Sequence, residues 1–125
     1  MTHIQEQPER EQRILFEIVV DAYDESERAM GWYYYLQDAL EFPFMASCIS
    51  RRATSPLLIG SKVEVFDLAL EDDCMSEIHV LVKYGKQSKL KLAVPLAQLE
   101  CLSGNEKTRQ AVEDWHYWVA RGYEY

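Results

Sequence analysis

The sequence has no long apolar run, so we expect no membrane-spanning helix, and its polar start, MTHIQEQPEREQR, predicts no signal peptide. Cysteine is scarce. Cys48, Cys74 and Cys101 are odd in number and widely spaced, which argues against a disulfide framework and favours a reducing cytoplasm. Repeats, low-complexity segments and linkers are also missing, so the 125 residues predict a single domain with one modest core.

Basic residues are few: thirteen stand against twenty-one acidic ones, giving a net charge of −8. This sign argues against binding nucleic acid or an anionic membrane, although the stretch KYGKQSKLK is locally basic. Catalytic motifs are also missing, since no glycine-rich phosphate loop, G-x-S-x-G elbow or H-E-x-x-H helix is found. We therefore predict a protein that is not an enzyme.

Residues 1–42 are predicted to be helical. The first helix follows Pro8, although the alternation of Ile14, Phe16, Ile18 and Val20 would also suit a strand. Asp24 and Glu27 are spaced like a capping box, which opens a second helix that ends near Glu41. Its inward face is predicted to carry Ala29, Trp32, Tyr33, Leu36 and Leu40.

Residues 43–102 have the two-residue period of β-strands, for example at Val63 and Val65 and at Ile78, Val80 and Val82. Four or five short strands at close spacing predict a small SH3-like antiparallel β-barrel. Residues 103–125 predict a C-terminal helix, capped by Asn105 or Ser103 and stopped by Gly122. The fold class is therefore α+β, with a helical pair and a C-terminal helix packed on the barrel.

Glu71, Asp72 and Asp73 lie side by side in the turn LALEDDCMSE between two predicted strands, and Glu77 follows. In one interpretation these carboxylates are solvated and favour solubility. In the other they converge on a hard cation such as calcium, which takes about six to eight oxygen ligands. The turn lacks the glycine and spacing of an EF-hand loop.

Asp38 and Glu41 are three residues apart at the end of the second helix, where the helix dipole disfavours negative charge. A bound cation would remove that penalty, whereas exposure to water would make it small. Backbone carbonyls near Leu40, Leu70 and Cys74 are candidate additional ligands. Zinc is a poorer match, because Cys74, His79, Cys101 and His116 lack paired short spacing.

Long stretches resemble the CcbP family of calcium-binding proteins, of cyanobacterial type. They are EIVVDAYDESERAMGWYYYLQDALEFPF, SPLLIGSKVEV with LALEDDCMSE, LAVPLAQLE and AVEDWHYWVARGY. The resemblance implies calcium binding in the cytoplasm, a role in buffering or sensing free calcium, and no catalysis. It also implies ligands at Asp38 and in the EDDC turn, whereas Gln37 departs from the acidic residue expected there.

The sequence thus predicts a monomeric, cytoplasmic protein with calcium as its ligand, bound by Asp38, Glu41, Glu71, Asp72, Asp73 and Glu77. The alternative is a protein-interaction module that uses a barrel face and the exposed rings of Tyr34 and Tyr35, without a metal.

Overall fold

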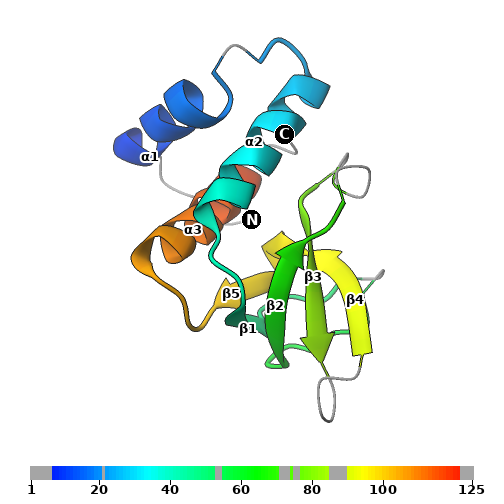
Figure 1. The fold of residues 1–125 in the computed structure, drawn as a ribbon. Helices are drawn as coiled ribbons and strands as arrows, with labels where there is room; N and C mark the ends of the chain where they lie inside the picture. The colour runs from blue at the N-terminus through cyan, green and yellow to red at the C-terminus, as the bar shows by residue number, and fades with distance from the viewer. Residues whose placement is uncertain are drawn as a thin grey trace.

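The computed structural model describes residues 7–20, 22–52, 55–70, 74, 77–84 and 90–121. Three α-helices and five β-strands follow one another in the order that the sequence predicts (Figure 1). The helical elements are α1 (Pro8–Arg13), η1 (Ile14–Ile18), α2 (Glu25–Ala39), η4 (Leu96–Gln98) and α3 (Glu106–Ala120). The strands are β1 (Phe44–Cys48), β2 (Lys62–Leu68), β3 (His79–Tyr84), β4 (Leu90–Pro95) and β5 (Leu99–Cys101). The predicted α+β class is confirmed.

The first helix is continuous but changes its winding, because α1 runs into the single π-helical stretch η1. The N–H of Val19 donates to the carbonyl of Ile14 at 2.9 Å, five residues back. Ile14 and Ile18 are buried, whereas Phe16 is 66% exposed and Val20 is 50% exposed. The alternative interpretation as a strand is therefore wrong, since only the positions that suit a helix face the core.

Helix α2 begins at the predicted capping box. The side chain of Asp24 accepts a hydrogen bond from the N–H of Glu27 at 2.8 Å, and the carboxylate of Glu27 accepts from the N–H of Tyr23 at 2.8 Å. The helix ends at Ala39, two residues before the predicted end, because Leu40 already has an extended backbone. The peptide bond that follows, Phe42–Pro43, is cis.

The five strands form one antiparallel sheet in the order β4-β3-β2-β1-β5. Alternate side chains of β1 face the core, as the two-residue period predicts, and those of β2 do so up to Val65, where a register shift interrupts the alternation. The closed SH3-like barrel is not confirmed, because no pairing joins the edge strands β4 and β5 within the described ranges. The short helical turn η4 links these two edges along the chain.

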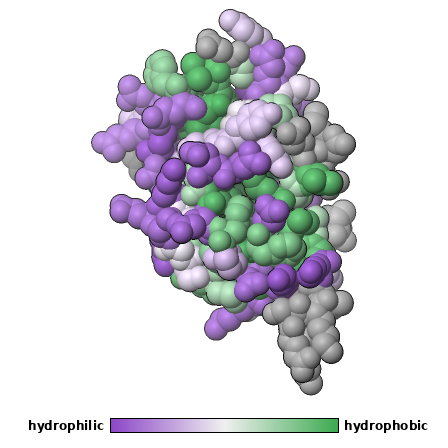
Figure 2. All heavy atoms as spheres, in the orientation of Figure 1, coloured by the Kyte–Doolittle hydropathy of each residue, from purple (hydrophilic) through white to green (hydrophobic). Residues whose placement is uncertain are grey.

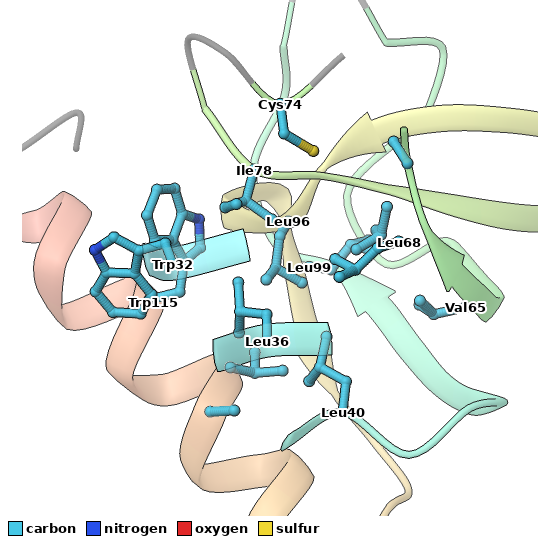
Figure 3. Close-up of a cluster of buried hydrophobic side chains, with 14 of the residues drawn as sticks. Trp32, Leu36, Leu40, Val65, Leu68, Cys74, Ile78, Leu96, Leu99 and Trp115 are labelled. Carbon is cyan, nitrogen blue, oxygen red and sulfur yellow. The ribbon is translucent and has the colours of Figure 1, made fainter. Parts of the chain in front are cut away.

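The core lies between α2, α3 and the sheet, and Figure 3 shows Trp32 and Trp115 meeting beside Leu36, Ile78, Leu96 and Leu99. The two indole rings meet edge to face, with centroids 5.0 Å apart and planes at 73°. All five predicted inward residues of α2 are buried. Aromatic packing between α2 and α3 therefore fixes the helical layer on the sheet.

Helix α3 is capped by Asn105, whose side chain accepts from the N–H of Thr108 at 2.8 Å. The other predicted cap, Ser103, instead accepts from the N–H of Met45 at 2.9 Å and ties β1 to the loop before α3. The predicted stop at Gly122 lies outside the described residues. None of the helices in the described ranges is long and apolar enough to cross a membrane.

Candidate functional site

The acidic turn connects β2 to β3, and its central residues Glu71, Asp72 and Asp73 lie outside the described residues. Its start is held by α2, because the hydroxyl of Tyr33 donates to the carbonyl of Ala69 at 3.0 Å. Leu70, one residue further, is 74% exposed. The chain therefore enters the acidic turn beside the middle of α2.

The turn returns to the sheet at Glu77, whose two carboxylate oxygens have different surroundings. Oε2 accepts a hydrogen bond from Arg52 Nη1 at 3.1 Å. Oε1 is buried and has no hydrogen-bond partner among the described groups. An anionic oxygen that is shielded from water and unpaired is a suitable donor for a hard cation, since calcium binds through oxygen.

Asp38 and Glu41 contact residues at the start of α3. Asp38 Oδ2 lies 3.4 Å from Lys107 Nζ, and both side chains are exposed. The carboxylate of Glu41 accepts from the amide of Asn105, and the backbone N–H of Glu41 donates to Thr108 Oγ1 at 3.0 Å. The N-terminus of α3 carries partial positive charge, so it offsets the unfavourable position of these carboxylates at the end of α2.

The start of the acidic turn, at Ala69, and the side chain of Asp38 lie at different positions around α2. Tyr33, which contacts the start of the turn, and Asp38 are five residues apart on the same helix. That separation is about 140° around the axis and about 7–8 Å along it. No group of three or more His, Cys, Asp or Glu side chains within the described residues is placed to hold a metal ion. The full ligand set stays a prediction.

The four zinc-ligand side chains are engaged in two separate places. Cys74 Sγ accepts from the backbone N–H of His79 at 3.4 Å, and His79 Nδ1 donates to the carbonyl of Glu77 at 3.0 Å. Cys101 Sγ donates to the carbonyl of Ser103 at 3.1 Å. His116 Nε2 donates to the carbonyl of Leu99. Burial lowers the pKa of His116 and raises the pKa of the Cys101 thiol, so both groups are kept neutral.

A cluster that the sequence analysis missed surrounds Asp114, which is completely buried in α3. Arg13 donates to both of its oxygens, at 3.0 and 2.6 Å, and Arg10 Nε lies 3.4 Å from Oδ1. The hydroxyl of Tyr35 donates to Oδ2 at 2.9 Å. Burial, followed by the charge of Asp114, raises the pKa of Tyr35 and keeps its phenol protonated.

The burial of Asp114 could have been predicted from the helical period, because Asp114 lies on the apolar stripe between Ala111 and Trp118 of the same helix. This cluster joins α1, α2 and α3, because both oxygens of Asp114 accept hydrogen bonds from side chains of the other two helices. It also uses Tyr35, so of the two tyrosines proposed for partner binding only Tyr34 presents an exposed ring.

The fold and the site together define an acidic α+β protein with candidate carboxylates at a helix end, Asp38 and Glu41, and beside the β2–β3 turn, Glu77. A family model described as calcium binding, that of the CcbP proteins, matches residues 12–119. The chain belongs to the CcbP family. The crystal structure of Anabaena CcbP is 38% identical over the full length of both chains, with a TM-score of 0.86.

A second structure, of a calcium binding protein in the calcium-binding form, is 39% identical over the full length of both chains, with a TM-score of 0.87. No curated protein matches the chain. Both structural matches extend over helices and sheet alike, so the likeness is one of the whole fold and is not limited to a local motif.

Proposed function

We propose that this protein binds calcium through surface carboxylates and so buffers or senses free calcium in the cytoplasm. The observation that carries the proposal is membership of the CcbP family, together with full-length similarity to a calcium binding protein in its calcium-binding form. The excess of acidic residues and the hard oxygen donors on the surface agree with this ion. The protein acts by binding the ion and not by catalysis.

The acidic turn, with Glu71, Asp72, Asp73 and Glu77, is proposed as the main site. Support comes from Glu77, whose buried Oε1 has no hydrogen-bond partner among the described groups and gains one if a cation lies in the turn. Arg52, on the other oxygen of Glu77, is partly exposed, and an ion pair of that kind contributes about 0–1 kcal/mol. Losing that contact therefore costs little compared with the attraction between a divalent ion and several carboxylates.

Asp38 and Glu41 are proposed as a second, separate group of ligands. Their contacts run to Lys107 and Asn105 on α3, on a different side of α2 from Tyr33. An ion at this position gains the carbonyls at the end of α2, near Leu40, but must displace Lys107. Binding here is therefore expected to be weaker than in the turn.

Calcium titration by isothermal calorimetry, in parallel with thermal melting in calcium and in chelator, tests the proposal. A ligand that binds only the folded state adds about 2.7 kcal/mol at a hundredfold excess over Kd, so the melting temperature should rise by several degrees. Magnesium should have a smaller effect, because it dehydrates reluctantly and requires octahedral geometry. No heat and no rise at millimolar calcium would reject calcium binding.

Charge-neutralising variants then locate the site. Asp72→Asn with Asp73→Asn should leave the stability of the calcium-free protein unchanged or slightly higher, because like-charge repulsion is removed, and should strongly reduce the calcium-induced rise. Asp38→Asn should reduce the rise by a smaller amount, and the two changes should be additive if they affect separate sites. An undiminished rise in the turn variant would show that the main site lies elsewhere.

A further inference from the structure

Positive charge is concentrated in one part of this acidic chain. Residues 78–99 contain four lysines and no aspartate or glutamate, although the whole chain has a net charge of −8. The other residues therefore hold nine basic and twenty-one acidic side chains, a charge of −12. Strands β3 and β4 lie in this segment, so one end of the sheet has the opposite charge from the rest of the molecule.

Two of the lysines are placed directly opposite each other, since Lys83 on β3 pairs in register with Lys91 on β4. Their ammonium groups lie 5.0 and 5.9 Å from the centre of the Phe66 ring on β2. Glu64 lies 3.8 Å from Lys83, and no carboxylate within the described residues pairs with Lys91. Like charges opposite each other across strands are unfavourable, so this arrangement favours a further negative group.

The same strand is the outermost one of the sheet, and within the described residues no other strand pairs with its outer edge (Figure 1). The N–H of Leu96 donates to the carbonyl of Ile78 at 2.9 Å. Counting back from this pair, every second residue of β4 has its backbone N–H and C=O directed toward β3. Leu92 and Val94 consequently direct their backbone groups toward β3, while those of Lys91 and Ala93 point away from the sheet. The N–H and C=O groups of Lys91 and Ala93 could therefore pair with the backbone of an added strand.

We propose that the β4 edge binds an extended, acidic peptide segment of a partner protein, which adds to the sheet as a further strand. Its backbone would pair with Lys91 and Ala93, and its carboxylates would lie over Lys83 and Lys91. Charge complementarity selects this occupant, because within the described residues Glu64 is the one carboxylate that pairs with either ammonium group, and it pairs with Lys83 alone. On the face shown in Figure 2, hydrophobic and hydrophilic residues are mixed over the sheet-bearing part of the molecule.

A nucleic acid fits this surface less well. The charge of −12 on the remainder repels a long polyanion, whereas a short peptide contacts only the basic strand pair. The ring of Phe66 already lies beneath two ammonium groups and is not free for a base to stack on it. The peptide site shares no residue with the proposed calcium ligands, so binding should be equal in calcium and in chelator.

Fluorescence anisotropy with a labelled peptide of alternating glutamate and valine tests the proposal, and the same peptide with glutamine for glutamate is its control. The full-length protein should bind the acidic peptide and not the neutral one. Lys91→Gln should weaken binding by about two- to fivefold, the effect of one exposed ion pair. The matched change Lys107→Gln, on α3, should leave it unaltered.

Ala93→Pro separates strand addition from simple charge attraction. It removes only an N–H that points away from the sheet, so an edge strand tolerates it, and peptide binding should be lost although the charge is unchanged. Amide chemical shifts provide a measurement without mutation, since the largest changes on adding peptide should fall on Lys91 and Ala93. Calorimetry with calcium on the same sample tests the calcium proposal independently.

Four results would overturn the inference. They are no binding of the acidic peptide at low salt, equal binding of the neutral peptide, wild-type binding by folded Ala93→Pro, and shifts confined to another face. Tighter binding of a single-stranded oligonucleotide or of phosphatidylserine vesicles would assign the basic surface to those polyanions instead. Concentration-dependent self-association that blocks the peptide would assign the edge to a second copy of this chain.

Discussion

Replacing Asp114 by Asn removes the negative charge at the centre of the buried cluster and leaves the overall shape of the side chain unchanged. The carboxylate has no solvent exposure and receives Arg13 at 3.0 and 2.6 Å and Tyr35 at 2.9 Å. Removing one partner of a buried ion pair costs about 3–5 kcal/mol, because the remaining charge stays desolvated. The two arginine side chains are 24% and 21% exposed, so they keep part of their hydration.

We therefore expect the lower end of that range, a loss of about 3 kcal/mol in the free energy of unfolding. For a chain of this length, each kcal/mol lowers the melting temperature by about 3–5 °C, so the variant should melt about 10 °C lower. Urea denaturation followed by circular dichroism and by tryptophan fluorescence measures the loss. Trp32 and Trp115 lie in the core, so both signals should report the same transition.

Glu113→Gln is the matched control, since Glu113 is the neighbouring residue and lies 3.4 Å from Arg10, with 64% of its side chain exposed. Its loss should be below about 1 kcal/mol. Adding Arg13→Met to Asp114→Asn should cost less than the sum of the two single changes, because the uncompensated guanidinium is then gone. A loss below about 1 kcal/mol for Asp114→Asn would refute the idea that this cluster holds the three helices together.

Two further predictions concern close packing and pH. Gly31→Ala should destabilise the protein by about 1–2 kcal/mol in urea unfolding, because the added Cβ would lie 2.3 Å from the carbonyl oxygen of Ile18. This overpacking outweighs the gain in helix propensity of about 1 kcal/mol. An equal or higher stability would contradict the prediction. His116 has a lowered folded-state pKa, so protons favour the unfolded chain, and stability should fall as the pH drops below about 6.5, the unfolded value. His116→Gln should reduce that dependence in melting curves between about pH 7 and 5, and an unaltered slope would exclude this histidine as its source.

Several features could be predicted from the sequence because they depend on interactions between residues close together in the chain. The capping box at Asp24 and the cap at Asn105 depend on residues within one turn of chain, and both form as predicted. The alternation in β2 and β3 likewise assigned the buried faces, because side chains of a strand point alternately to the two sides of the sheet. The same rule could not decide whether the sheet closes, since closure depends on the distance between its edges and not on any one strand.

For the candidate site too, the sequence identifies the acidic residues, whereas their contacts depend on the tertiary structure. The sequence alone marks Asp38, Glu41 and the turn from Glu71 to Glu77 as acidic, and long matching stretches already indicated the calcium-binding family. It could not tell that Asp38 faces Lys107, which lies 69 residues away along the chain. Nor could it tell that, among the described groups, Arg52 pairs with one oxygen of Glu77 and none pairs with the other, because Arg52 is 25 residues away along the chain.

What the sequence by itself determined is the order of helices and strands, their caps, their buried faces and the excess of negative charge, all of which depend on neighbouring residues or on composition. The tertiary structure alone decided that Asp114 is buried between arginines about a hundred residues earlier in the chain. It also decided that Lys83 on β3 and Lys91 on the outermost strand β4 meet beside Phe66. The physical reason is that the energy of a charge depends on its solvent exposure and on the charges beside it, and both are set by which distant segments pack together.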